Sequence, residues 1–149
     1  MGAHKTWREK LEAMQERKIV DTPKGRMLVS KPLDVDALIR KIPAGRLATI
    51  GQMRARLAKD FGADYTCPLT TGIFLRIAAE AAEEELKRGE AQVAPYWRIV
   101  RNDGSLNEKL PGGVEAQAAR LRGEGHTIEQ SRGKGSFRVK GFERSLAEI

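Results

Sequence analysis

The residues of this chain that could do chemistry gather around an adjacent aromatic pair, Tyr96 and Trp97, followed by Arg98. The chain has only two Trp and two Tyr in 149 residues, so their adjacency behind Pro95 is unusual. A phenol without a neighbouring base is a poor nucleophile at neutral pH, and an indole is a weaker one. The pair is therefore not expected to act as a nucleophile, and plain core residues are one interpretation of it.

The single cysteine, Cys67, is a second candidate for chemistry. It stands beside Pro68 at the predicted start of a helix, where the helix dipole favours a thiolate. No histidine lies near it in the sequence, and such a cysteine is more often a small buried hydrophobic residue. Because His4 and His126 are far apart, we expect no zinc site, and we expect no other cofactor.

The charge of the chain favours a polyanionic partner. Its 27 basic and 20 acidic residues give a net charge of +7, and neutralised phosphates release counterions when such a surface binds nucleic acid. A basic surface kept for solubility is the alternative. No apolar run approaches the ~20 residues that span a bilayer, and the N-terminus lacks a signal-peptide core. With one cysteine, these features predict a cytoplasmic, nucleoid-associated protein.

Apolar spacing divides the chain into an extension, residues 1–33, and a main domain, residues 34–149. The extension is predicted to hold a short helix, with Trp7, Leu11 and Met14 on one face, followed by an irregular basic arm.

The main domain is predicted to begin with three helices, at residues 35–42, 50–61 and 68–88. Asp34 and Thr49 are the expected N-caps of the first two, and Gly62 is the expected end of the second. The third helix starts with small residues that would let it approach another backbone closely.

The second and third helices, joined by a short turn, predict a helix-turn-helix. Residues 126–142 add two strand-like runs around the turn "RGKG", which predicts a basic hairpin. The fold class is therefore α+β, a helix-rich winged helix-turn-helix DNA-binding domain. The residues expected to face a groove of DNA are Thr70, Thr71, Gly72 and Arg76. Those expected at phosphates are Arg54, Lys134, Arg138 and Lys140, unless the hairpin is only a solvated edge.

Two segments carry a resemblance to a known family. "PYWRIVRNDGSLNEKLPGGVEAQAARLRGEGH" and the upstream "IPAGRLATIGQMRARLA" resemble the DNA-binding domain of the O6-alkylguanine-DNA alkyltransferases. The match extends over about residues 34–126. In that family, the residue after the motif proline is the cysteine that accepts the alkyl group, and the next is a histidine oriented by a glutamate.

The departures from the family pattern change the expected activity. Tyr96 stands in place of the cysteine, Trp97 in place of the histidine, and Glu124 at the glutamate position. The resemblance implies the alkyltransferase-like proteins, which bind alkylated guanine in DNA without repairing it and pass the lesion to repair proteins. We therefore expect no enzymatic activity, a monomer, and double-stranded DNA with alkylated guanine as the partner.

The resemblance also implies a base pocket, with the residues Tyr96, Trp97, Arg98, Leu110, Gly112, Gly113 and Glu124. Ile50 and Leu69 stand where the family has a nucleotide-rotating tyrosine and an intercalating arginine, and Arg76 is the nearest substitute. The glycine pair exposes backbone N–H groups to an anion or is simply a tight helix entry. Two alternatives remain: a general DNA-binding or regulatory protein that lost the pocket, and an enzyme acting through Cys67.

Overall fold

The computed structural model describes residues 6–13, 16–130 and 137–149. Lys134, a predicted phosphate contact, lies outside the described residues, as does Met14. Among these described ranges, no helix has the length and apolar character needed to cross a membrane.

The helices of the described ranges are α1 (Trp7–Ala13), α2 (Pro32–Ile39), α3 (Ile50–Phe61), α4 (Pro68–Lys87) and α5 (Gly113–Gly123). Two 3-10 helices are η1 (Tyr96–Arg98) and η2 (Phe142–Ser145). The strands are β1 (Lys18–Thr22), β2 (Gly25–Val29), β3 (Ala48–Thr49), β4 (Tyr65–Thr66), β5 (Ile99–Val100), β6 (Ile128–Gln130) and β7 (Phe137–Val139). They form three small sheets with the orders β1-β2-β4, β3-β5 and β6-β7. The predicted α+β class is confirmed.

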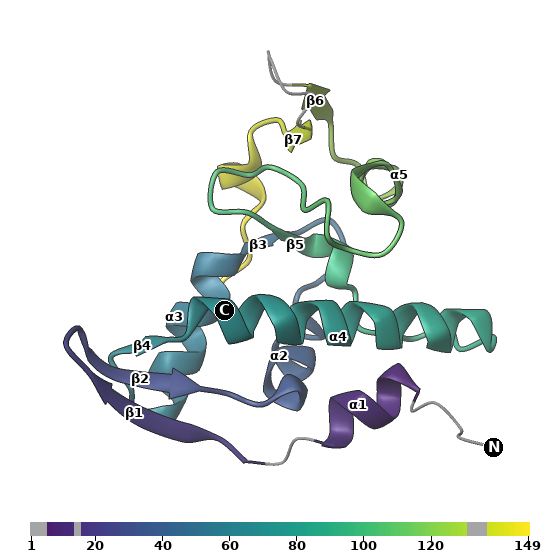
Figure 1. Ribbon diagram of the computed structural model, residues 1–149. Coiled ribbons are helices and arrows are strands. Elements are labelled where there is room, and N and C mark those ends of the chain that lie inside the picture. The colour runs from purple at the N-terminus through teal and green to yellow at the C-terminus, as the bar shows by residue number, and fades with distance from the viewer. Residues whose placement is uncertain (1–5, 14–15, 131–136) are drawn as a thin grey trace.

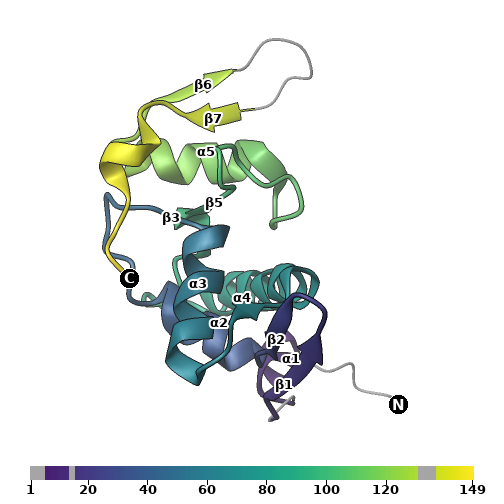
Figure 2. The same cartoon turned by 90° about the vertical axis from the view of Figure 1, so that its left-hand side faces the viewer.

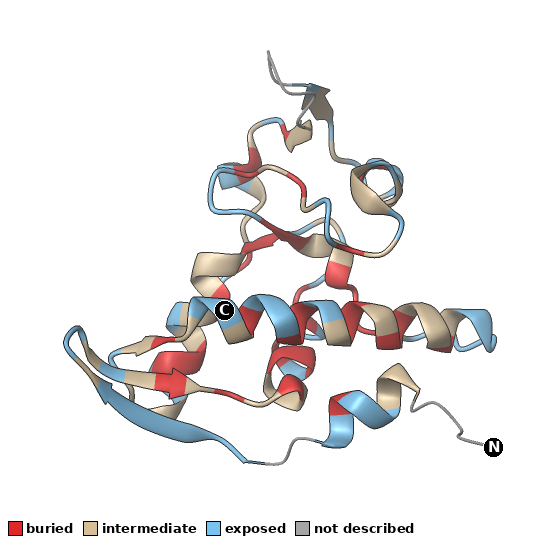
Figure 3. Ribbon diagram, viewed as in Figure 1, coloured by how far each residue is buried: buried red, intermediate tan, exposed pale blue. Residues whose placement is uncertain are grey.

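The long helix α4 runs through the middle of the molecule, with α1, α2 and the β1–β2 hairpin on one side (Figure 1). On the other side lie the short β3–β5 sheet, the loop that follows β5, and α5. Buried residues concentrate where α4 faces α2 and along β3 and β5 (Figure 3). The core therefore lies on the side of α4 that faces α2 and the β3–β5 sheet, and the opposite face of this helix is open to solvent.

The predicted helix-turn-helix is formed by α3 and α4, which are joined by a short segment containing β4. The predicted hairpin is also present, because β6 and β7 pair antiparallel with Gln130 opposite Phe137. Figure 2 shows α5 between this hairpin and α4. The hairpin thus packs beside α5 rather than beside the second helix of the helix-turn-helix.

The first helix of the main domain starts earlier than predicted. Lys31 is the N-cap of α2 and Pro32 is its first residue, since the fixed φ of proline suits the first helical turn. Asp34 is therefore the third helical residue, and its carboxylate accepts a hydrogen bond from the Lys31 backbone N–H at 3.1 Å. The apolar face of this helix packs into the core, because Val35 and Ile39 are fully buried.

The second helix agrees with the prediction at both ends. The Thr49 hydroxyl accepts from the Gln52 backbone N–H at 3.1 Å, and the Gln52 side chain accepts from the Thr49 N–H at 2.9 Å. Gly62 ends α3 in the left-handed conformation, with a φ of 71°. Met53 and Leu57 of this helix face the core.

The predicted irregular arm is wrong, because residues 18–29 form a regular antiparallel hairpin. Thr22 pairs with Gly25 across a two-residue turn, and Gly25 adopts a φ of 121° that favours glycine. Strand β2 also runs parallel to β4, which joins the hairpin to the helix-turn-helix. Leu11 of α1 and Leu28 of β2 are fully buried in the core of the main domain. The described part of the extension therefore packs on that core.

Candidate nucleic-acid interface

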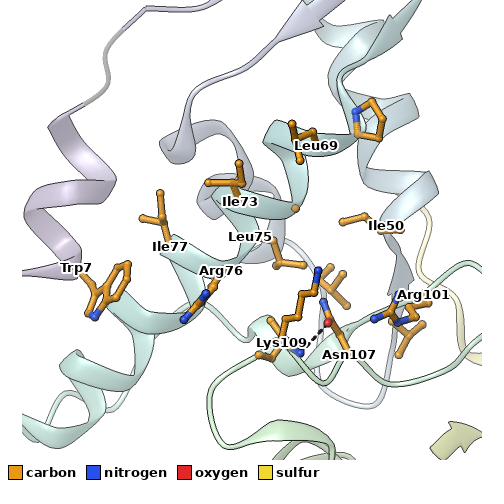
Figure 4. Close-up of a pocket in the computed structure, with 15 residues that line it drawn as sticks. Trp7, Ile50, Leu69, Ile73, Leu75, Arg76, Ile77, Arg101, Asn107 and Lys109 are labelled. Atoms are coloured by element: carbon orange, nitrogen blue, oxygen red, sulfur yellow. Dashed lines mark hydrogen bonds between the residues drawn. The ribbon is translucent and has the colours of Figure 1, made fainter. Parts of the chain in front are cut away.

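A cavity of about 680 Å³ lies against the solvent-facing side of α4, between this helix and the loop after β5. Its described lining residues are Trp7, Ile50, Pro68, Leu69, Gly72, Ile73, Leu75, Arg76, Ile77, Ile99, Val100, Arg101, Asn107, Lys109 and Leu110. In Figure 4, the apolar residues Leu69, Ile73 and Ile77 follow one another along α4. Arg101 and Lys109 come from the loop opposite.

The cavity is electropositive. Its described lining holds three cationic side chains, Arg76, Arg101 and Lys109, and no carboxylate. Arg101 is partly neutralised, because its guanidinium pairs with Glu108 outside the cavity at 2.8 Å. The first N–H groups of α4 add partial positive charge at the Pro68 end, since a helix N-terminus attracts anions. This end of the molecule is therefore suited to a phosphate-bearing ligand.

The open face of α4 is apolar at its N-terminal end. Leu69 is 72% exposed and Ile73 is 49% exposed, whereas most large apolar residues of a soluble domain are buried. Helical spacing places Leu69, Gly72, Ile73 and Arg76 on one face. Gly72 and Arg76 thus face outward, and their contact with DNA stays a prediction.

The prediction that Thr71 faces DNA is wrong. Its side chain is fully buried, and its hydroxyl donates to the Cys67 carbonyl at 2.6 Å. The reason is geometric, because position 71 lies on the side of α4 that meets the core. Thr70 is half-buried beside the open face.

The Tyr96 ring is turned into the core rather than toward the cavity. Its exposed fraction is 2%, and its hydroxyl donates to the Glu83 carboxylate of α4 at 2.6 Å. Arg120 of α5 pairs with the same carboxylate oxygen at 2.8 Å. Burial first, and then the Glu83 carboxylate, raise the pKa of Tyr96 well above its ordinary value. The phenol stays protonated, so it is not a nucleophile.

Trp97 belongs to a second cluster, centred on Glu124. The indole N–H donates to this carboxylate at 3.0 Å, and the Arg98 guanidinium pairs with it at 2.7 Å. Arg98 also donates to the Ile42 carbonyl at 2.6 Å, so the cluster ties η1 to the turn after α2. Burial opposes ionisation of Glu124, but the hydrogen bonds from Arg98 and Trp97 outweigh it and lower the pKa. Glu124 therefore holds its neighbours in place.

The predicted base pocket and the observed cavity differ. Of the predicted pocket residues, Leu110 lines the cavity, and the other six are absent from its described lining. Gly112 begins α5 with a φ of 78°, and a Cβ there would lie 2.5 Å from the Ala116 Cβ. This favours the alternative that Gly112 and Gly113 are a tight helix entry.

The fully buried side chain of Gln117 fixes the loop that borders the cavity. Its amide donates to the carbonyls of Trp97 at 3.0 Å and Ile99 at 2.9 Å. Its oxygen accepts from the Asn107 backbone N–H at 2.9 Å. One side chain of α5 thus joins η1, β5 and the loop.

Cys67 lies outside the described lining of the cavity, as the N-cap of α4. Burial acts to raise the pKa of its thiol, but hydrogen bonds from Thr70 and Leu69 and the charge of Arg54 lower it overall. The described parts of the chain hold no group of three His, Cys, Asp or Glu side chains that could bind a metal ion.

The predicted phosphate contacts are scattered. Arg54 donates to the Thr66 carbonyl at 3.0 Å and so joins α3 to β4. Arg138 donates to the Asp103 carbonyl at 2.6 Å and pairs with Glu129 at 3.4 Å, which occupies its guanidinium within the fold. Lys140 is exposed at the end of β7. None of these three side chains is among the described lining residues of the cavity.

Comparison with known proteins rests on solved structures, since neither a family model nor a curated protein matches this sequence. The chain matches S. pombe Atl1 in complex with damaged DNA containing O6-carboxymethylguanine, with a TM-score of 0.55. It also matches S. pombe ATL in complex with DNA, with a TM-score of 0.57. Both are 19% identical to it, and each match covers 79% of this chain and 94% of the other. The chain has the alkyltransferase-like fold.

The fold implied by the resemblance of the segment around PYWR is therefore confirmed. Ile50 and Leu69, two of the expected departures from the family pattern, both line the cavity. Four other lining residues were not predicted as site residues: Trp7, Arg101, Asn107 and Lys109. Lys109 is next to the predicted Leu110 and belongs to the segment that resembles the family, so the motif could have indicated it. Trp7 lies outside that segment.

Proposed function

We propose that this protein is a non-enzymatic DNA-binding protein that recognises alkylated guanine in the cavity beside α4. The single observation that carries the proposal is the composition of that cavity, in which apolar side chains of α4 face cations and no described carboxylate. The structural neighbours are complexes with DNA, and one of them contains O6-carboxymethylguanine.

DNA binding would use the open face of α4. The exposed side chains of Leu69 and Ile73 are of the apolar kind that minor-groove proteins insert between base steps. Arg76 of α4 and Lys109 of the loop opposite also line the cavity and would neutralise phosphates. The cavity would then receive an unstacked base, whose extrusion costs a few kcal/mol and costs least for a damaged base pair.

Recognition would proceed without alkyl transfer. Tyr96 stands at the family's acceptor position, but its phenol is protonated and directed to Glu83. Trp97 donates its N–H to Glu124 and carries no basic nitrogen to activate a nucleophile. Cys67 is absent from the described cavity lining. A bound lesion would therefore persist and be passed to repair proteins at the nucleoid.

The test is fluorescence anisotropy with two duplexes that differ only in one guanine, unmodified or O6-methylated. We expect the methylated duplex to bind at least about tenfold more tightly, which corresponds to about 1.4 kcal/mol. Equal affinities at several salt concentrations would remove lesion recognition.

A general DNA-binding or regulatory protein is the second candidate. The observation that favours it is the burial of Tyr96, which fills the family's acceptor position. On this proposal the protein binds the methylated and unmodified duplexes with equal affinity. The affinity depends on the salt concentration and not on the methyl group. In either case residues 34–149 would be the DNA-binding domain, with residues 1–33 as an extension.

A further inference from the structure

One wall of the cavity comes from the N-terminal extension. Trp7 of α1 lines the cavity, although it precedes the segment that resembles the alkyltransferases. Figure 4 shows Trp7 beyond Ile77, at the end of the row that Leu69 and Ile73 begin. Among the described lining residues, Trp7 is the one aromatic side chain.

The position of Trp7 is fixed from two directions. Its backbone N–H donates to the Glu84 carboxylate of α4 at 2.8 Å. Leu11, one turn later in α1, is fully buried in the core. The start of α1 is therefore anchored against α4, and the half-buried Trp7 packs against the core. A ring that is held in place contacts a ligand at little cost in conformational entropy.

A cation accompanies the ring. The Lys10 ammonium lies 4.1 Å from the centroid of the Trp7 ring, within the range of a cation–π contact. Lys10 is exposed, so its charge is also accessible to a phosphate. Aromatic rings beside basic side chains are the usual means by which proteins bind unstacked nucleotides.

We propose that Trp7 contacts the unstacked purine base in the cavity and that α1 is thereby part of the lesion-binding site. This inference rests on the proposed function. It assigns to Trp7 the aromatic contact that Tyr96 and Trp97 do not make, because neither of these two rings is among the described lining residues of the cavity. The O6-alkyl group would lie against the apolar row of α4, where Ile77 adjoins Trp7.

The first test compares Trp7→Phe with Trp7→Leu by anisotropy, using the methylated and unmodified duplexes. Both variants keep an apolar side chain on α1, but only phenylalanine keeps a ring that stacks on a base. We expect Trp7→Leu to lose about tenfold in affinity for the methylated duplex, and Trp7→Phe to lose about threefold or less. Both should bind the unmodified duplex within about twofold of the wild type, as expected for surface substitutions. Equal losses in the two variants would mean that Trp7 only packs, and would overturn the proposal.

The second test uses the tryptophans themselves, since the chain has two. Trp97→Phe leaves Trp7 as the emitter, and Trp7→Phe leaves Trp97. We expect the methylated duplex to quench Trp7 emission at saturation, while the unmodified duplex quenches it less. Trp97 emission should be nearly unchanged, because Trp97 is outside the described cavity lining.

The outcomes separate this proposal from the function on which it rests. A preference for the methylated duplex with no quenching of Trp7 would overturn the role of Trp7 and leave lesion recognition standing. Equal affinities of the wild type for both duplexes would remove lesion recognition, and the role of Trp7 with it. Quenching together with the expected difference between Trp7→Leu and Trp7→Phe supports both.

Discussion

The Tyr96 hydroxyl donates a hydrogen bond of 2.6 Å to the Glu83 carboxylate, and this contact links η1 to the C-terminal part of α4. Arg120 pairs with the same carboxylate, so the Glu83 side chain of α4 is bonded to both η1 and α5. Tyr96 therefore stabilises the fold, and the cavity lies on the open side of α4.

Loss of this hydroxyl should destabilise the protein. We expect Tyr96→Phe to lower the free energy of unfolding by about 2 kcal/mol, since hydrogen bonds to charged groups contribute about 1.5–3 kcal/mol. Tyr65→Phe is a matched control, because the Tyr65 hydroxyl bonds to the neutral Thr22 hydroxyl at 2.8 Å. Its expected cost is about 1 kcal/mol. Urea unfolding measures both, and a Tyr96→Phe cost no larger than that of Tyr65→Phe would contradict the account.

The carboxylate of Glu124 should make stability depend on pH. Its pKa is lowered in the folded state, so its contribution is present above the ordinary value of 4.5 and is lost as the pH falls through the folded pKa. Glu124→Gln should therefore be clearly less stable than the wild type at pH 7. The difference should shrink at pH 3. Burial lowers the pKa of His126, and Glu124 opposes this effect. His126 is present in both the wild type and the variant, so its protonation contributes to the loss of stability of both proteins at low pH. A difference that is the same at both pH values would argue against the paired carboxylate.

The cations of the cavity should determine the salt dependence of DNA binding. Arg76→Ala and Lys109→Ala should each make the slope of log affinity against log salt shallower by about 1, the loss of one phosphate contact. Lys41→Ala is the control, because Lys41 is exposed after α2 and outside the described cavity lining. The slopes come from anisotropy titrations. Unchanged slopes in the first two variants would exclude the proposed DNA face.

The exposed leucine of α4 should matter for binding and not for folding. Leu69→Ala should change the free energy of unfolding by less than about 0.5 kcal/mol, because the side chain is 72% exposed. Its affinity for duplex DNA should fall about tenfold, as at a side chain central to an interface. Ile19→Ala, an exposed residue of β1, should leave affinity unchanged. Equal effects of the two substitutions would contradict the role of α4.

Local signals in the sequence predict much of the helix-turn-helix. Thr49 and Gly62 bound α3 through contacts within a few residues, so the sequence alone predicts both ends of that helix. The β1–β2 hairpin escaped prediction because Pro23 and Gly25 favour an irregular arm and a tight turn alike. Its pairing with β4 is a long-range contact.

The site was less predictable than the fold. The family motif identified the segment around Tyr96, but the direction of its ring depends on Glu83 and Arg120, which approach from two other helices. Thr71 was misplaced because small polar residues at a helix start suit a core contact as well as a DNA contact. Trp7 lies about 60 residues before Leu69, and only packing of α1 on α4 brings them to one cavity.

The most direct test of the account is NMR of the protein bound to a duplex whose O6-methylguanine carries a ¹³C-labelled methyl group. We predict nuclear Overhauser contacts from this methyl to the methyl groups of Ile73, Ile77 and Leu110, with the carbon shift of an O-methyl group. Contacts to Tyr96 in their place would put the base at the pocket that the family resemblance implies. A carbon shift typical of a thioether would mean transfer to Cys67, and either result would contradict non-covalent recognition beside α4.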